Sequence, residues 1–359
     1  TSIPEATHRK YPYLLRDLEV VRPDQVWWSA AGDPSSWPAI GTAAAATVRS
    51  DRQVMADGGH IQGILAGIGG TAAAIFGEKR IWRADAIGAP LVFQFTPVVL
   101  GRGVYSPGSL VGDGTTAYFL AEDGWYAFDG TNCVSIGTGI DRYFLADFDD
   151  NYREWVYGAV DVAGKVIYWA YPGAGNLGGI PNKWVMFSKT SGRWARGELE
   201  VDAVGQLVSQ GYTLEGLDVF GPLDTLPYSL DSRVYAGGGS FVGMVRASDH
   251  RLGQFGDNSS SSALQADWTA SEVSGPMGSR VWISGMKIYT DAPSVSGAIA
   301  WRDSGAGALS ETSYVEQDED FIDQLVACRF ARAKGRIPAV TAWTQVQGYD
   351  FDMRQEGRR

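Results

Sequence analysis

The stretch that decides the fold is GILAGIGGTAAAIFGEKRIWRADAIGAPLVFQFTPVVLGRGVYSPGSLVGDGTTAYFLAEDGWYAFDGTNCVSI, residues 63–136. Short runs rich in β-branched and aromatic residues alternate with Gly, Pro, Asn and Asp at intervals of about ten residues, as in an all-β sandwich, barrel or propeller. Alternating positions let each run bury one face and expose the other. We interpret four of its aromatic residues as packing residues: Trp82, Trp125, Tyr126 and Phe128.

Two hairpins with the same pattern follow, WVYGAVDV with KVIYWAYP and then KWVMFS with RWARGE, within residues 155–198. Adjacent hairpins of one pattern predict repeated four-stranded units. Further strands are expected at 204–209, 216–220, 232–236 and 241–246, and a short helix or loop at 51–60. The sequence therefore predicts a β-propeller region at 25–256, preceded by an N-terminal arm at 1–24.

The composition changes at DNSSSSA, residues 257–263, a polar low-complexity run typical of a domain boundary or exposed loop. Long alternating runs follow it. In RVWISGMKIYTD, for example, Trp282, Ser284, Met286 and Ile288 alternate with the residues between them. These runs predict a C-terminal β-sandwich-like domain at 263–359.

The bulk composition narrows the class of protein. The chain has 359 residues with 46 Gly, 13 Trp and a net charge of −11, which argues against wrapping duplex DNA through phosphate contacts. Cys133 and Cys328 form no CxxC pair and are interpreted as lone buried thiols. No apolar run is long enough to span a bilayer, so we expect no membrane insertion of this chain.

Motifs that could carry chemistry each have a simpler interpretation. GAGNLG, residues 173–178, matches G-x-G-x-x-G, but a Pro and a strand follow where a phosphate site needs a helix. LADFDDNY, residues 145–152, offers oxygen ligands for a hard cation, yet its spacing favours a solvated helix start. EQDEDFID, residues 316–323, is expected as an exposed acidic loop. QVWWSAAGDPSSWP, residues 25–38, is either a hairpin corner closed by aromatics or a sugar-stacking platform.

The order of these signals resembles a known family. VWWSAAGDPSSWP, GILAGIGGTAAAIFGEKRIWRAD and KWVMFSKTSGRWAR are followed by RVWISGMKIYTD, ARAKGRIPAVTAWTQV and QGYDFDM. Over residues 26–352 the chain resembles the tail nozzle (tail hub) proteins of short-tailed bacteriophages, and related proteins that stabilise packaged DNA. The resemblance implies a β-propeller with a small β domain, assembled as a six-fold ring below the portal and its adaptor. Such a ring encloses the channel for genome exit and docks fibres, spikes or a needle.

We therefore expect a structural virion protein of the tail, assembled in the host bacterial cytoplasm, with no enzymatic activity, catalytic residue, cofactor or metal. Double-stranded DNA would pass through the channel without specific binding, because an acidic lining repels phosphates. The alternative from another class is a glycan-binding or glycan-hydrolysing β-propeller; a host adhesion scaffold is a third hypothesis.

Long loops at the ends of a β scaffold are where partner contacts are expected. Four such loops stand out, at 173–181, 221–227, 257–262 and 316–323. The residues predicted to lie at interfaces are Gly173, Asn176, Asp257, Asn258, Glu316, Asp318, Glu319 and Asp320.

Overall fold

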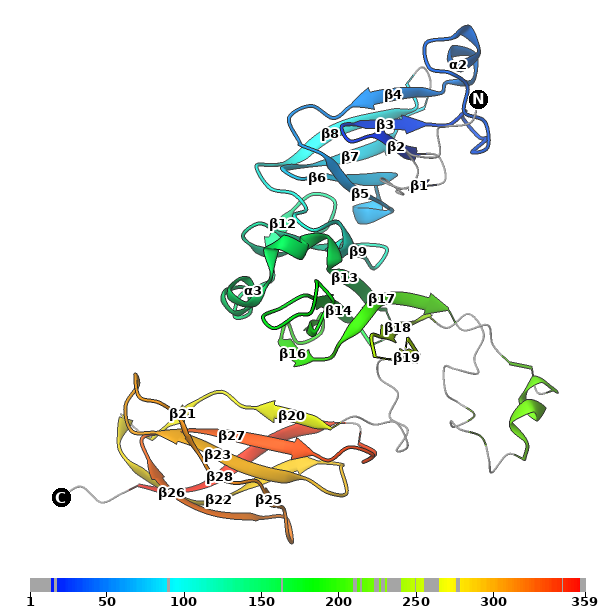
Figure 1. The fold of residues 1–359 in the computed structure, drawn as a ribbon. Helices are drawn as coiled ribbons and strands as arrows, with labels where there is room; N and C mark the ends of the chain where they lie inside the picture. The colour runs from blue at the N-terminus through cyan, green and yellow to red at the C-terminus, as the bar shows by residue number, and fades with distance from the viewer. Residues whose placement is uncertain are drawn as a thin grey trace. The chain divides into compact units, whose positions relative to one another are not determined.

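The computed structural model of the protein is drawn in Figure 1. It describes residues 14–15, 18–88, 91–162, 164–208, 212–213, 215–222, 226, 230, 240–248, 250–254, 265–275, 278–343 and 345–355. The chain divides into two compact units. The first comprises Thr1–Glu215 with Asp231–Phe255, and the second comprises Gly216–Leu230 with Gly256–Arg359.

Among the described residues, the strands of the first unit form five antiparallel sheets, each running up and down in chain order (Figure 1). The first sheet is β1 (Leu14–Leu15), β2 (Leu18–Arg22), β3 (Gln25–Trp28) and β4 (Asp51–Val54), and the second is β5 (Ile61–Ala66), β6 (Ala73–Gly77), β7 (Arg80–Ala86) and β8 (Phe93–Leu100). The third is β9 (Val111–Gly112), β10 (Ala117–Ala121), β11 (Gly124–Phe128) and β12 (Cys133–Ser135), and the fourth is β13 (Tyr157–Asp161), β14 (Val166–Tyr171), β15 (Lys183–Ser188) and β16 (Trp194–Glu198). The fifth is β17 (Val201–Val208), β18 (Ser240–Arg246) and β19 (Leu252–Gln254). The all-β class and the repeated four-stranded units predicted from the sequence are confirmed.

The helical segments are short. In the described residues they are the α-helices α2 (Ala43–Val48) and α3 (Asp141–Asp147) and the 3₁₀ helices Ile68–Gly70, Pro107–Ser109, Asp150–Trp155 and Glu215–Phe220. Helix α2 begins at Thr42, whose hydroxyl accepts a hydrogen bond from the Ala45 amide at 3.2 Å, and it ends at Arg49 in the left-handed region.

Three segments differ from the expectation. Within the segment 1–24, expected as an arm or as the outer strand of a unit, residues 18–22 form strand β2 and pair with β3. The segment 51–60 begins with strand β4 because β3 offers it a ladder, while the alanine-rich run before it forms the helix. Residues 216–220 were expected as a strand and instead form a 3₁₀ helix, which satisfies its backbone locally.

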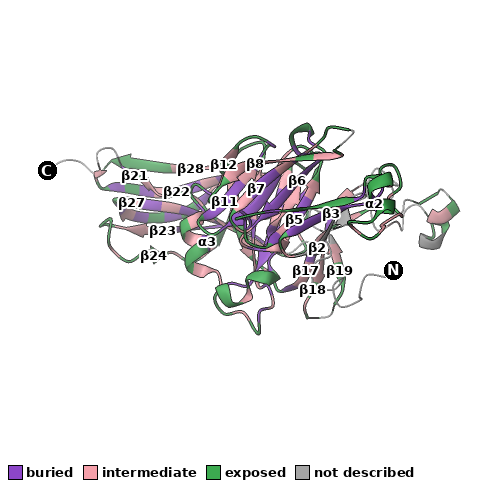
Figure 2. Ribbon diagram, turned by 90° about the horizontal axis from the view of Figure 1, so that it is seen from above, coloured by how far each residue is buried: buried purple, intermediate pink, exposed green. Residues whose placement is uncertain are grey.

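A buried apolar layer lies between each sheet of the first unit and the next in chain order. Ring pairs mark three of the layers, with centroids 5.8 Å apart for Trp28 and Phe93, 5.7 Å for Phe76 and Phe119, and 4.3 Å for Trp125 and Trp169. Figure 2 shows the buried residues along β5, β6 and β7. The blades of a propeller pack in the same way. Closure of a propeller by contact between the first and last sheets stays a prediction from the sequence.

The four aromatic residues interpreted as packing residues are all buried: Trp82, Trp125, Tyr126 and Phe128. Trp125 and Phe128 have no exposed surface, so their whole area contributes to the layers on the two sides of the third sheet. Burying a large apolar side chain contributes about 1.5–3 kcal/mol to folding. The prediction that these residues build the scaffold is confirmed.

The Asp-Gly turns between strands use the aspartate side chain as a hydrogen-bond acceptor. Asp129 Oδ1 accepts from the amides of Thr131 at 2.8 Å and Asn132 at 2.6 Å. Asp113 Oδ1 accepts in the same way from Thr115 at 2.9 Å and from the amide after it. Each side chain thereby satisfies backbone donors that a tight turn leaves open. These two carboxylates therefore stabilise the turns. The hydrogen bonds from the backbone amides also lower the pKa of Asp129.

Asp113 also ties the third sheet to the fourth, because the Lys189 ammonium between β15 and β16 bonds its carboxylate. Burial raises the pKa of Asp113, but the hydrogen bonds from Lys189, Thr116 and Thr115 outweigh it and hold the pKa at about 2. A lowered native pKa stabilises the fold above the unfolded value near 4, and that stabilisation is lost as the pH falls through 2.

Asp113→Asn is therefore expected to lower stability at pH 7 by up to about 2 kcal/mol. The difference in unfolding free energy between wild type and variant should become smaller between pH 4 and pH 2, because the wild-type carboxylate becomes protonated in that range. Urea unfolding of both proteins at pH 7, 4, 3 and 2.5 measures the gap. A gap that is constant with pH would show that the Asp113 charge does not contribute.

The second unit is a β-sandwich. Its larger sheet contains the described strands β20 (Ala266–Thr269), β21 (Val273–Ser274), β23 (Ser296–Arg302), β24 (Ser310–Glu311), β25 (Val315–Glu316) and β27 (Phe330–Ile337). Its smaller sheet has the order β26 (Ile322–Cys328), β22 (Val281–Thr290) and β28 (Val346–Gln355). The inward residues of both sheets form one buried cluster that includes Ile283, Ile299 and Val326. Along β26, buried residues alternate with exposed or half-buried ones, as expected for a strand with one solvated face.

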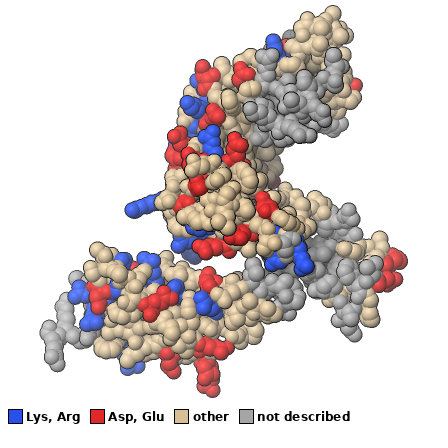
Figure 3. Space-filling view, in the orientation of Figure 1, with Lys and Arg blue, Asp and Glu red and all other residues tan. Residues whose placement is uncertain are grey.

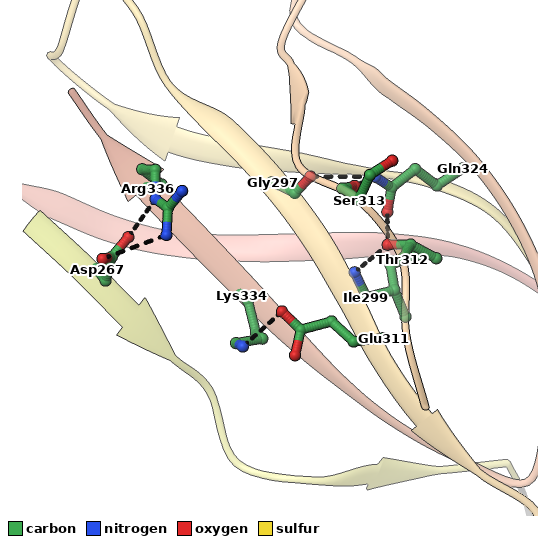
Figure 4. A network of polar contacts seen from close by, with 9 residues as sticks. All are labelled: Asp267, Gly297, Ile299, Glu311, Thr312, Ser313, Gln324, Lys334 and Arg336. Atoms are coloured by element: carbon green, nitrogen blue, oxygen red, sulfur yellow. Dashed lines mark hydrogen bonds and ion pairs between the residues drawn. The ribbon is translucent and has the colours of Figure 1, made fainter. Parts of the chain in front are cut away.

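One buried polar side chain connects the two sheets of the sandwich (Figure 4). Gln324 on β26 donates to the carbonyls of Gly297 at 3.1 Å and Ser313 at 2.7 Å, and its oxygen accepts from the Thr312 hydroxyl at 2.7 Å. The Thr312 hydroxyl in turn accepts from the Ile299 amide at 2.8 Å. Every polar atom of the Gln324 amide group has a partner, as burial requires.

Candidate functional site

The loop between β14 and β15 contains two of the predicted interface residues and is held against the segment that follows α3. The Asn176 side-chain amide donates to Asp149 Oδ2 and to the Gly173 carbonyl, both at 3.0 Å, and its oxygen accepts from the Gly179 amide at 2.9 Å. The Asp149 amide donates to the Pro172 carbonyl at 3.0 Å. These bonds bring together two motifs that the sequence presents separately, GAGNLG and LADFDDNY.

An ion pair lies beside this loop. Lys183 Nζ on β15 is 2.6 Å from Asp147 Oδ1 at the end of α3, and each side chain is only 12% exposed. The Tyr171 hydroxyl donates to the other carboxylate oxygen at 3.0 Å. A Cβ on Gly173 would lie 2.6 Å from Asp147 Oδ2, so only glycine allows the chain to pass this close.

The contacts with Asp147 keep Lys183 and Tyr171 protonated. Burial lowers the pKa of Lys183, but the hydrogen bond and charge of Asp147 raise it further, so the ammonium stays protonated. Burial raises the pKa of Tyr171, and the Asp147 carboxylate adds to the effect. A lysine and a tyrosine that both keep their protons are poor bases at neutral pH. The arrangement therefore supports positioning and polar recognition.

A shallow hollow of ≈ 360 Å³ opens next to the ion pair. Its lining residues are Ala174, Asn182, Lys183, Glu198, Leu199 and Glu200. Asn182 Oδ1 accepts from the Gly173 amide at 2.8 Å, which joins the hollow to the predicted interface loop. Two glutamates and an amide give this surface mostly hydrogen-bond acceptors, which suits a partner group that donates hydrogen bonds.

The oxygen-rich motif LADFDDNY is occupied by protein partners. Asp147 is bound by Lys183 and Tyr171, Asp149 by Asn176, and Asp150 accepts from a tyrosine hydroxyl. Within the part of the chain that the structure describes, no group of three or more His, Cys, Asp and Glu side chains could hold a metal ion. GAGNLG lies between β14 and β15, so a strand and not a helix is the next element after it. The interpretation of the latter motif as a loop is confirmed.

Both cysteines are free thiols, as the sequence predicted, and only Cys328 is fully buried. Cys133 is half-buried on β12. Burial raises the pKa of Cys133 to about 11, so the thiol is protonated at neutral pH and is a weak nucleophile.

The acidic run 316–320 forms a tight hairpin turn between β25 and β26. The Asp318 and Phe321 backbones exchange two hydrogen bonds, at 3.0 Å and 2.8 Å, across the two-residue tip. Glu319 (φ 42°) and Asp320 (φ 71°) both have positive φ, as a type I′ turn requires. Asp320 pairs with Lys287 at 2.8 Å, and Glu316 accepts from the Ser294 hydroxyl at 2.7 Å. The predicted loop is therefore an ordered turn with a carboxylate at its strained tip.

Glu319 has a side chain in a backbone region that favours Gly and Asn. Glu319→Asn is expected to raise the stability of the second unit by about 0.5–1 kcal/mol, because Asn tolerates the left-handed conformation. Thermal unfolding measures the gain. Asp320→Asn is the matched control. Aspartate already tolerates the left-handed region, and the variant loses the ion pair with Lys287, so no gain in stability is expected from it. Equal gains in both variants would contradict the explanation from backbone strain.

The structure separates the predicted interface residues into distinct places. Gly173 and Asn176 lie in the anchored loop of the first unit, whereas Glu316, Asp318, Glu319 and Asp320 lie on the hairpin of the second. Asp257 and Asn258 lie outside the described residues. Sequence reasoning missed the pairing of Asp147 with Lys183, because 36 positions separate them and no motif relates them.

Acidic and basic side chains are interspersed on the faces visible in Figure 3. Several of them form ion pairs within their unit, among them Arg102 with Asp123 at 2.8 Å and Arg336 with Asp267 at 2.6 Å. Among the described residues, no helix has both the length and the apolar character needed to cross a bilayer.

The chain matches no protein-family model, and a comparison with curated proteins gives no match. Among solved structures, one described as "Glycoside hydrolase" aligns with 92% of this chain and 90% of its own, at 10% sequence identity and a TM-score of 0.20. A TM-score this low does not indicate a shared fold.

Proposed function

We propose that this protein is a structural virion component, a tail nozzle or hub subunit of a short-tailed bacteriophage. Six copies would form a ring below the portal adaptor. The ring would retain the genome and conduct it during ejection, and it would dock fibres, spikes or a needle. The proposal rests on the resemblance in segment order over residues 26–352.

The observation that carries the proposal is the serial packing of the sheets in the first unit. Each sheet shares a buried layer with the next one in the chain, and aromatic side chains fill these layers. Ion pairs and Asp-centred turns then fix the connections between strands. A wall built in this way is rigid, which a channel that holds pressurised DNA needs.

The net charge of −11 supports passage of DNA without capture. DNA phosphates bind clustered Lys and Arg by releasing counterions, and an acidic lining removes this source of affinity. The purified protein is therefore expected to give no retardation of duplex DNA at 50 mM salt. A ring whose lumen is predominantly basic would overturn this part of the proposal.

The assembly test is analytical ultracentrifugation and electron microscopy of the purified full chain, alone and with a dodecameric portal adaptor. The expected particle contains six copies of the 38.7 kDa chain, arranged as a ring that joins the adaptor. A stable monomer at micromolar concentration that also fails to join the adaptor would refute the nozzle function.

The hairpin tip at Glu319 and the anchored loop at Asn176 are the proposed contact points of the ring. Glu319→Lys is expected to weaken assembly, because it reverses the charge of an exposed turn. Glu122→Lys makes the same charge change at an exposed turn of the first unit and serves as the control. If both variants assemble like wild type, the hairpin tip makes no contact that assembly needs.

A further inference from the structure

The outer face of the smaller sandwich sheet carries a hollow of ≈ 340 Å³ that belongs entirely to the second unit. Trp282 on β22 and Leu325 on β26 line it, and they are 42% and 71% exposed. A volume of this size is at the lower end of the range for small-molecule sites. Two large apolar side chains at the solvent face of a three-stranded sheet call for an explanation other than core packing.

A β-bulge at Ser284 creates the hollow. In the ladder with β28, β22 has one extra residue between Ile283 and Gly285, whereas the ladder with β26 shifts register at the same place through an extra residue on β26. As a result, Ile283 and Met286 both point into the core, whereas Trp282 and Ser284 face outward. Bulges of this kind re-aim side chains and are frequent beside binding sites.

Gly285 then leaves a gap in the outer face. It lies opposite Asp323 on β26 and Asp352 on β28, so two outward carboxylates flank a position without a side chain. Given the spacing of neighbouring strands, the backbones of the two aspartates lie about 10 Å apart. A Cβ on Gly285 would lie 2.3 Å from the Ile322 carbonyl oxygen and 2.6 Å from the Phe321 ring, and this ring also lines the hollow.

One polar group of the hollow, the Asp352 carboxylate, is held in place by a neighbour. The Ser284 hydroxyl donates to the Asp352 carboxylate, which fixes this acceptor beside the gap. Arg354 lies opposite Trp282 on the neighbouring strand and supplies hydrogen-bond donors. The hollow thus combines two aromatic rings, two carboxylates and one guanidinium on one rigid sheet.

We propose that this hollow binds a pyranose unit of a neutral polysaccharide. The flat C–H face of a pyranose ring packs on an aromatic ring, and its hydroxyls donate to carboxylates and accept from a guanidinium, which are the groups present here. Two carboxylates against one guanidinium disfavour an anionic sugar. A protein partner would need roughly 800 Å² of buried surface on this side, far more than one hollow of this size offers.

The test is isothermal titration calorimetry of the full chain with cellohexaose and with chitohexaose, whose rings expose flat apolar faces. Saturable binding of at least one probe is expected, and Trp282→Ala should weaken it by at least about tenfold. Trp282→Phe keeps an aromatic ring and should retain part of the affinity. Tyr289→Ala is the matched control, since Tyr289 is also exposed on β22 (39%) but lies outside the hollow, and this variant should bind like wild type.

Three outcomes would overturn the proposal. They are the absence of saturable binding with both probes, equal binding by wild type and Trp282→Ala, and an equal loss in Trp282→Ala and Tyr289→Ala. If Trp282→Ala instead changes the oligomeric state while neither sugar binds, the hollow is a protein contact and the sugar site is refuted. Far-UV circular dichroism confirms that each variant is folded. Ring formation is read independently by sedimentation, so sugar binding can fail while the nozzle function stands.

Discussion

Replacing Trp169 by alanine is expected to lower the free energy of unfolding of the first unit by about 4 kcal/mol, within the range measured for buried Trp and Phe. Trp169 has no exposed surface and lies in the aromatic layer between the third and fourth sheets. Its ring centroid is 4.3 Å from that of Trp125 and 5.7 Å from that of Trp194. The cavity left by alanine would remove contacts from both sheets at once.

A pair of milder variants separates packing from hydrogen bonding in this layer. The Trp169 indole donates to the buried Ser109 carbonyl at 2.8 Å. The Trp125 indole nitrogen is also buried but has no hydrogen-bond partner among the described residues. Trp169→Phe should therefore cost about 1–2 kcal/mol more than Trp125→Phe, because only the first leaves a buried carbonyl unpaired.

Urea unfolding followed by far-UV circular dichroism measures both differences. Equal losses in Trp169→Phe and Trp125→Phe would show that the Ser109 hydrogen bond adds nothing to packing. A loss below about 1 kcal/mol in Trp169→Ala would contradict the assignment of this layer as a core.

Replacing Lys183 by methionine is expected to cost about 2–3 kcal/mol, because it leaves the largely buried Asp147 carboxylate without its cation. Methionine keeps most of the length of the lysine side chain, so the loss reports the charge. The Asp147→Leu/Lys183→Met double variant removes both charges and should recover much of this loss. The recovery, measured as the coupling energy of a double-mutant cycle, tests whether the two groups act as a pair.

Arg102→Met provides the matched control for this ion pair. Arg102 and Asp123 are 2.8 Å apart, much like the buried pair, but their side chains are 37% and 52% exposed. Exposed pairs contribute at most about 1 kcal/mol, so Arg102→Met should have a small effect. If the two single variants lose the same stability, burial is not what makes the Asp147–Lys183 pair important.

The presence of repeated antiparallel strands in the first unit followed from local sequence. In residues 63–136 the Gly, Pro and Asp punctuation places turns, and the turns fix where strands β5 to β12 begin and end. Turn chemistry is local, since an aspartate bonds amides two and three residues ahead of it. The prediction of a strand at 216–220 was wrong because an apolar run forms a strand only where a neighbouring strand is available to pair with it.

In the second unit, local sequence did not predict on which side of its sheet each side chain lies. Simple alternation places Trp282, Ser284, Met286 and Ile288 on one face, whereas the bulge puts Trp282 and Ser284 outside and Met286 and Ile288 in the core. Gly285 is a local signal of a bulge, since an isolated glycine in a strand often marks one, but strict alternation along β22 does not show where the faces change.

By itself, the sequence determined an all-β protein with repeated antiparallel units, buried aromatic layers and a separate C-terminal sandwich. Periodicity and turn residues act over a few positions, so they can be read from the chain. Only the tertiary structure decided which polar groups meet: Asp147 with Lys183, Asp113 with Lys189, and the row of Asp323, Gly285 and Asp352. These contacts join positions dozens of residues apart, and they exist because sheet packing and strand register bring the positions together.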